Sequence, residues 1–141
     1  MQYLLLIHVD EALVDALPDG HFDTMMRECF GHADALRDAG HLLQSQQLQP
    51  PATGRSIRVR NGQRSVIDGP FAEAKELVAG YTLIQAKSKE EAMEWTRRFP
   101  NPAGDGKQAE IEVRQLYELE DFEPREARDR FQELEKSYSN R

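Results

Sequence analysis

A strongly apolar strand pattern, two amphipathic helices and a hairpin signal between them place this chain in the α+β class. The apolar run lies in residues 2–9, and the helices are expected at about residues 21–39 and 89–99. Asn61-Gly62 marks the hairpin, and strand patterns flank each helix. The resulting order of elements, β-α-β, hairpin, β-α-β, predicts a ferredoxin-like sheet with an inserted β-hairpin.

Residues 2–9 are expected to form a central strand, because both faces of the segment are apolar. One face carries Tyr3, Leu5, Ile7 and Val9, and the other carries Leu4, Leu6 and His8. A strand of this kind has to be covered on both sides. The two helices of the chain can cover only one side, so the other needs a second layer. This surplus of apolar sheet predicts a homodimer.

The first helix is expected to follow Pro18-Asp19-Gly20 and to run to about Ala39. Its apolar residues recur at spacings of three and four and form one stripe, which comprises Phe22, Met25, Met26, Cys29, Phe30, Ala33 and Leu36. Gly40 stands where helices commonly end. Cys29 lies within the stripe and is interpreted as an inert core thiol.

The remaining elements follow from local signals. Strands are expected at residues 41–48, 56–60, 63–67, 81–87 and 109–117. Asn61-Gly62 suits the tight turn of a hairpin, and Ser88 followed by Glu91 forms a capping box at the start of the second helix. Pro100 ends that helix. Residues 1–122 therefore form one domain, and residues 123–141 form a polar, helical C-terminal extension.

Composition narrows the functional classes. A chain of 141 residues is large enough for one domain with its own core. The net charge of −7 argues against nucleic-acid binding, which depends on neutralising phosphates. The apolar run at residues 3–7 is too short for a signal peptide or a membrane span. One cysteine excludes an internal disulfide and suits a reducing cytosol, so a cytoplasmic location is expected.

The segment that begins at Asp68 has the densest group of chemically active side chains. Asp68-Gly69-Pro70 is turn chemistry, and Pro70 has no N–H with which to satisfy the Asp68 carboxylate. The carboxylate must therefore cap a later amide or point elsewhere. Glu73, Lys75 and Glu76 follow within one or two helical turns. A rigid carboxylate beside a lysine and a histidine is the arrangement of a general base.

These residues carry a family resemblance. Asp68 to Glu76, followed by Gly80-Tyr81, resembles the signature of the YCII-related proteins, in the branch known by its Asp-Gly-Pro-Phe motif. Further matches are Met1 to Ile7, Ala39-Gly40, Leu48-Gln49-Pro50 and Glu112-Val113-Arg114, so the resemblance covers about residues 1–122. Ala74 and Gln115 depart from the family pattern. The resemblance implies a bacterial protein with a ferredoxin-like fold of the dimeric α-β barrel type.

Histidines are the other candidates for catalysis. His8 lies in an apolar strand, where its side chain must be covered and hydrogen bonded. His32 borders the apolar stripe of the first helix and either faces a cleft or is a partly exposed boundary residue. His41 follows the helix stop and is expected at the surface. Each also has a purely structural interpretation, and a satisfied core histidine is the commoner role for His8.

Two hypotheses follow, together with an expectation about cofactors. The first is a small-molecule cleft with Asp68, His8 and His32 as catalytic residues and Glu73, Lys75, Glu76 and Arg114 as ligand-binding residues, performing proton transfer or elimination. The second is a non-catalytic regulatory module; the resemblance implies an association with sigma factors of the extracytoplasmic-function type. The sequence lacks His-x-His, His-Glu-x-x-His and Cys-x-x-Cys spacings and a phosphate loop, so neither a metal nor another cofactor is expected.

Overall fold

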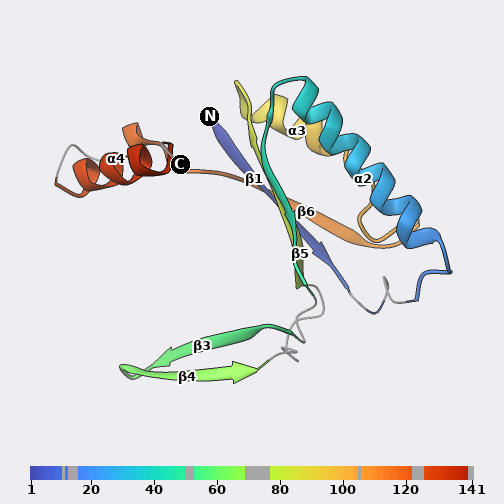
Figure 1. The fold of residues 1–141 in the computed structure, drawn as a ribbon, viewed down its shortest axis with the longest axis horizontal. Helices are drawn as coiled ribbons and strands as arrows, with labels where there is room; N and C mark the ends of the chain where they lie inside the picture. Colours follow the sequence, from blue (N-terminus) through green and yellow to red (C-terminus); the bar gives the residue numbers. More distant parts are fainter. Residues whose placement is uncertain are drawn as a thin grey trace.

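The main sheet, two covering helices, a separate hairpin and a C-terminal helix make up the described part of the chain. A computed structural model describes residues 1–10, 12, 16–49, 53–68, 77–104, 106–121 and 126–139. Figure 1 shows both covering helices on one side of the sheet, with the hairpin and the C-terminal helix extending from the body. The α+β class expected from the order of elements is confirmed, and the arrangement is consistent with a ferredoxin-like fold.

The main sheet has the strand order β2-β5-β1-β6, and all neighbouring strands are antiparallel. Its strands are β1 (Gln2–Val9), β2 (Leu42–Gln47), β5 (Leu77–Gln85) and β6 (Ala109–Gln115). The first strand of the chain is therefore central, as its two apolar faces predicted. β5 begins four residues earlier than expected, because its first residues pair with β1 beyond a bulge at Ile7/His8.

Local signals set the helix ends as predicted. α2 (His21–Asp38) stops at Gly40, which has a φ of +81°. The amide of His41 donates to the Leu36 carbonyl at 2.8 Å, and that of Gly40 donates to the Arg37 carbonyl at 2.9 Å, so the last carbonyls of the helix are satisfied. α3 (Lys89–Arg97) begins after Ser88, whose side chain accepts a hydrogen bond from the Glu91 amide at 3.2 Å.

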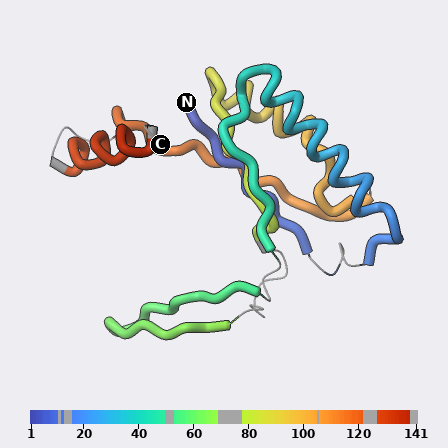
Figure 2. Tube along the Cα trace, in the orientation of Figure 1, coloured from blue at the N-terminus to red at the C-terminus, as the bar shows by residue number. Residues whose placement is uncertain are grey.

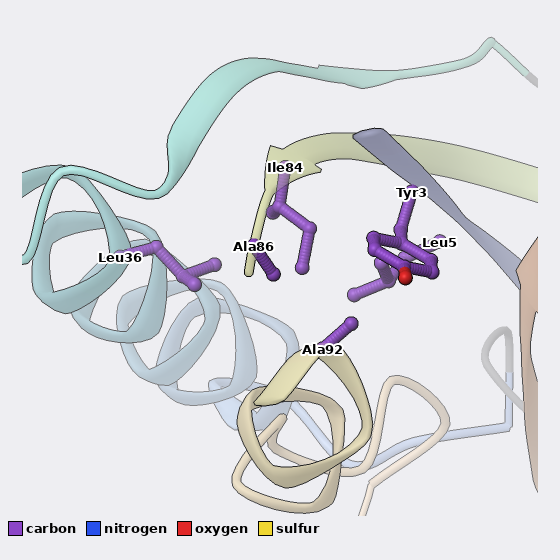
Figure 3. Packing of buried hydrophobic residues seen from close by; sticks show 6 residues of the cluster. All are labelled: Tyr3, Leu5, Leu36, Ile84, Ala86 and Ala92. Carbon is purple, nitrogen blue, oxygen red and sulfur yellow. The ribbon is translucent and has the colours of Figure 1, made fainter. Parts of the chain in front are cut away.

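The hydrophobic core lies between these two helices and the sheet. Figure 3 shows side chains from the sheet, from α2 and from α3 meeting there, and the residues drawn are Tyr3, Leu5, Leu36, Ile84, Ala86 and Ala92. Trp95, Phe99, Ile111 and Val113 pack around this cluster. Burying a leucine or isoleucine side chain contributes about 1.5–3 kcal/mol, so this cluster accounts for much of the fold's stability.

The other side of the sheet is left without a layer by the described part of the chain. The register pairs Leu4 with Leu83 and Leu6 with Tyr81, so these four side chains lie on the face away from α2 and α3. We call this surface the open face. Its four residues are only partly buried, whereas Tyr3 and Leu5 on the covered face are fully buried. This difference in burial agrees with the sequence argument that the helices of one chain can cover only one of the two apolar faces of β1.

The hairpin and the C-terminal helix are separate from the sheet. Within the described residues, β3 (Arg55–Arg60) pairs only with β4 (Gln63–Asp68), through a turn in which Asn61 and Gly62 have φ values of 51° and 74°. Positive φ at both positions is what the tightest hairpin turns require. A short 3-10 helix, η2 (Leu119–Asp121), precedes α4 (Glu126–Ser139). Figure 2 shows the trace of both segments away from the main body.

Two details differ from the sequence predictions. Phe22 and Phe30 are exposed although they belong to the apolar stripe of α2, because the surface that α2 covers is narrower than the stripe. The buried positions on this helix are Met25, His32 and Leu36. β6 ends at Gln115 rather than Tyr117. Within the described ranges, no helix is both long and apolar enough to cross a membrane.

Candidate functional site

A cavity of about 390 Å³ lies between α2 and the covered face of the sheet, on the side of β2 and β5. Its apolar wall comes mainly from α2, β1 and the loop after α3, and comprises Ile7, Val9, Met25, Met26, Cys29, Phe30, Ala33, Leu36, Phe99 and Pro102. Its polar side chains come from His32, Ser45, Gln47 and Thr82, and the lining also includes Gln46, Ala79, Gly80 and Tyr81. Strand alternation turns the side chains of Gln46 and Tyr81 to the open face, so these two residues border the cavity through their backbone. Volumes of this size are typical of sites for small molecules.

The floor of the cavity depends on close approach of two strands. A Cβ atom at Gly80 would lie 2.8 Å from the backbone oxygen of Gln46, so only glycine fits between β5 and β2 at this point. Beside it, the hydroxyls of Ser45 and Thr82 hydrogen bond to each other at 3.0 Å. Thr82 is buried, and this bond gives its hydroxyl a partner. Because a hydroxyl can both donate and accept, the group can still form a further hydrogen bond. The strand pair thus presents a narrow polar strip to an otherwise apolar space.

His32 is the most unusual residue in the lining. It is only 9% exposed, and its Nε2 atom is fully buried with no hydrogen-bond partner in the described part of the chain. The imidazole contacts the Phe99 ring edge-on at 5.0 Å between centroids and lies 6.1 Å from Trp95. Burial lowers the pKa of His32, the positive charge of Arg98 lowers it further, and hydrogen bonding with the Trp95 backbone opposes both. The ring is therefore neutral at pH 7.

Cys29 lies one turn before His32 on the same helix and also lines the cavity. Its side chain is partly buried, and burial together with the nearby Glu28 charge raises the pKa of the thiol. A neutral thiol is a weak nucleophile. This agrees with the interpretation of Cys29 as a chemically quiet residue, although it borders a cavity rather than the centre of the core.

Charge is lacking in this cavity. None of the described residues in its lining is an Asp, Glu, Lys or Arg. A buried ion needs a partner of opposite charge, and an unpaired one is costly to bury. The site is therefore suited to an uncharged molecule with a mainly apolar body.

A second polar cluster lies on the other side of the sheet. Nε2 of His8 is 3.2 Å from Oε2 of Glu112, whose other oxygen accepts a hydrogen bond from the Arg114 guanidinium. Hydrogen bonds from Arg114 and then from His8 lower the pKa of Glu112. His8 thus has the hydrogen-bond partner that its strand position required. The register on β1 and β6 places this cluster beside Leu6, on the open face.

The candidate residues from the sequence fall into three places. Asp68 is the last residue of β4; it is 75% exposed, forms an ion pair with Nε of Arg55 at 3.1 Å, and is absent from the cavity lining. His8 and Arg114 meet through Glu112, on the face opposite His32. Glu73, Lys75 and Glu76 lie outside the described residues. The described part of the chain therefore brings His8 and Arg114 together and separates them from His32.

The expectation of a surface role for His41 is wrong. The side chain is only 19% exposed, and its Nδ1 lies 2.9 Å from the Gln85 carbonyl oxygen. Its Nε2 lies 3.1 Å from Oε1 of Glu91. These contacts join the end of α2, the end of β5 and the first turn of α3, because the helix stop at Gly40 turns the chain inward. His41 is therefore a structural tie between three elements.

Sequence reasoning missed the strand side of the cavity. Ser45 and Thr82 are 37 residues apart and adjoin only through the pairing of β2 with β5. A signal existed at Gly80, because a glycine inside a strand pattern often marks close backbone approach. For metals, the described residues contain no group of three or more His, Cys, Asp or Glu side chains that could hold an ion.

Comparison with known proteins adds a family to this geometry. The sequence model of the YCII-related domain matches residues 1–118. An uncharacterised protein of Rhizobium meliloti is 32% identical over 101 residues, which cover 72% of this chain and 82% of that protein. The match to the family model spans the sheet, both covering helices and the hairpin, and it ends before α4.

Proposed function

This chain belongs to the YCII-related family, and from that premise we propose that it binds a small, uncharged, mainly apolar molecule in the cavity beneath α2. The observation that carries the proposal is the pairing of a cavity of about 390 Å³ with a buried histidine whose Nε2 has no hydrogen-bond partner among the described residues. A buried polar atom without a partner costs about 1–3 kcal/mol. A ligand that hydrogen bonds to this atom would recover that cost on binding.

The lining defines the class of ligand. A neutral imidazole has one nitrogen that donates and one that accepts. A hydroxyl group can serve either role, so an alcohol satisfies Nε2 in both tautomers. A carboxylate would be buried without a cation, because the described lining has no Lys or Arg. We therefore favour an alcohol with a hydrocarbon body over an organic acid.

Proton transfer is part of this proposal, with His32 as the base. A histidine that is neutral at pH 7 can accept a proton, and the His32 ring is part of the cavity lining, so a ligand would reach Nε2 once the side chains packed over that atom move aside. Asp68 is exposed and paired with Arg55. His8 is held by Glu112 on the opposite face. Their catalytic roles stay predictions, and we assign the base to the histidine that borders the cavity.

Binding is tested by NMR titration with cyclohexanol, methylcyclohexane and cyclohexanecarboxylate, which share one ring and differ in a single substituent. Cyclohexanol should shift backbone signals around Ala33, Gly80 and Thr82, with affinity about three- to tenfold above that of methylcyclohexane, because one net hydrogen bond contributes roughly 0.5–1.5 kcal/mol. Cyclohexanecarboxylate should bind least. Shifts confined to the open face, or no shifts with any probe, would refute the site.

A variant isolates the role of His32. His32→Phe keeps an aromatic ring beside Phe99 and removes both ring nitrogens. It should bind cyclohexanol and methylcyclohexane with equal affinity, while Ser65→Ala in the hairpin should leave the preference intact. An unchanged preference in His32→Phe would show that another group recognises the hydroxyl.

A homodimer is the second part of the proposal. Leu4, Leu6, Tyr81 and Leu83 leave an apolar strip on the open face that a second copy would cover. Leu6→Arg places a charge in that strip. Light scattering coupled to size-exclusion chromatography should report a dimer for the natural chain and a monomer for the variant. A monomeric natural chain at 100 μM, a concentration about a hundredfold above a micromolar Kd, would count against pairing.

An interaction module without chemistry is the alternative, and a different observation favours it. The hairpin carries four arginines with one aspartate and exposes Ile57, Val59 and Val66. Such a surface suits a protein partner, and the resemblance suggests an extracytoplasmic-function sigma factor in the bacterial cytoplasm. Co-purification of such a factor with the natural chain, and its loss with the chain ended at residue 121, would favour this alternative. Equal recovery with both chains would argue against a role for the C-terminal extension.

A further inference from the structure

We propose that, in the dimer, α4 of each copy packs on the apolar face of the other copy's β3–β4 hairpin. This inference depends on the dimer proposed above, and it adds a second contact that the paired sheets alone do not provide. It follows from two exposed apolar surfaces, their positions around the open face, and their opposite charges.

The first surface is one side of the hairpin. The register pairs Ile57 with Val66 and Val59 with Arg64, so these side chains share a face. Ile57, Val59 and Val66 are 59–67% exposed. We call these three residues the apolar hairpin face. Arg58 and Ser65 pair on the opposite side, which is polar apart from Ile67. An isolated two-stranded hairpin is at best marginally stable in water, so this face needs cover.

The second surface is one side of α4. Leu134 and Tyr138 are one turn apart and are 49% and 64% exposed. Phe131 lies one turn before Leu134 on the same side, and it is half-buried. A 14-residue helix gains little stability from its own hydrogen bonds and normally depends on packing of an apolar side. This helix therefore also needs a partner surface, and a helix on a sheet is a standard way to bury both.

The two surfaces are placed for exchange between copies. Figure 1 shows α4 and the hairpin on the same side of the main sheet, opposite α2 and α3 and at different ends. Figure 2 gives the same separation along the trace, so the two do not meet within one chain. A two-fold rotation about an axis that lies between the two open faces, at right angles to the line joining these ends, brings the faces together and exchanges the ends. Each α4 then lies over the other copy's hairpin, and the contact occurs twice.

Charge favours the same pairing. Residues 55–68 contain four arginines and one aspartate, a net charge of +3. Residues 118–139 contain eight acidic and four basic side chains, a net charge of −4. Opposite net charges favour association of the two segments and disfavour pairing of two hairpins or two α4 helices.

Disulfide trapping tests the contact directly. Cys29→Ala is introduced first, and two single-cysteine chains are then made, Val59→Cys and Leu134→Cys. Mixing them under mild oxidation should give a disulfide-linked dimer of the two different chains, because each cysteine would face the other across the contact. Ser65→Cys, on the polar side of the hairpin, is the matched control and should give no such product with Leu134→Cys.

A second measurement does not depend on cysteine geometry. Ile57→Asp should raise the dimer dissociation constant by roughly a hundredfold, because the loss of one buried side chain is felt at both symmetric contacts. Arg58→Asp, which alters charge on the polar side, should change it far less.

Each outcome decides the matter. A dimer that forms normally but gives no Val59–Leu134 product, and tolerates Ile57→Asp, would overturn the α4–hairpin contact and leave the dimer in place. A monomer would overturn both. A chain carrying both cysteines that closes on itself as a monomer would show that α4 folds onto its own hairpin, which also contradicts the proposal.

Discussion

Replacing glycine by alanine is expected to have opposite effects on stability at Gly80 and at Gly31. At Gly80, the added Cβ would lie 2.8 Å from the Gln46 backbone oxygen and 3.4 Å from the Gln47 Cα atom. The contact is with backbone on a paired strand, so β2 has to move away from β5. Overpacking of this kind costs about 1–3 kcal/mol. We therefore expect Gly80→Ala to lower the free energy of unfolding by that amount.

Gly31 is the matched control. It lies inside α2, its added Cβ would meet nothing within 4 Å, and its φ is ordinary for a helix. Alanine is favoured over glycine in a helix interior by roughly 1 kcal/mol. Gly31→Ala should therefore raise the free energy of unfolding. The two variants should differ from each other by about 2–4 kcal/mol.

Urea denaturation followed by circular dichroism measures this difference, and the melting temperature should move by roughly 3 °C per kcal/mol. Amide NMR shifts caused by Gly80→Ala should concentrate on β2, including Ser45 at the cavity. If both variants gained stability to a similar degree, β2 would not approach β5 as closely as described. The account of the cavity floor would then be wrong.

Three further predictions rest on burial. Leu36→Ala should lower the free energy of unfolding by about 2–5 kcal/mol in urea titrations, because Leu36 is fully buried, whereas Leu43→Ala at an exposed position should change it by less than about 1 kcal/mol. The lowered pKa of His32 means that below the ordinary value of 6.5 the unfolded chain binds a proton that the folded chain resists, so stability should fall from pH 7 to pH 5. His32→Leu should flatten that dependence; the lowered pKa of Glu112 acts only below its ordinary 4.5, outside this range. The raised pKa of Cys29 predicts slower alkylation by iodoacetamide at pH 7 than for free cysteine, and equal rates would contradict its burial.

Local chemistry explains why so much of the fold was predictable. Gly40 ends α2, Ser88 begins α3 and Asn61-Gly62 turns the hairpin, and each acts through its own backbone or a near neighbour. The apolar faces of β1 also predicted its central place. It was less predictable which residues of an apolar stripe are buried, because that depends on how much of the helix contacts the rest of the protein. Phe30 fits the apolar stripe of α2 by spacing, yet it lies at the exposed edge of the cavity.

The cavity itself could not be derived from spacing. His32 was recognised as a candidate, but its burial depends on Trp95 and Phe99, which arrive from α3 and the loop after it. The polar strip needs Ser45 and Thr82 to meet across two strands. Motif density drew attention to Asp68, whose described partner is Arg55 on the adjacent hairpin strand. A charged motif shows that several ionic side chains are close together in the sequence. It does not show whether other helices and strands enclose those side chains in a cavity.

The central place of β1 has a consequence during synthesis. Both neighbours of this strand are encoded far downstream, since β5 begins at Leu77 and β6 at Ala109. The strongly apolar segment at residues 2–9 therefore leaves the ribosome long before either neighbouring strand has been synthesised. Closing the sheet then requires contacts between residues far apart in the sequence, which form late in folding. Until β5 is synthesised, β1 has no strand to pair with, and its second edge stays unpaired until β6 follows, so the incomplete chain exposes apolar surface that favours aggregation.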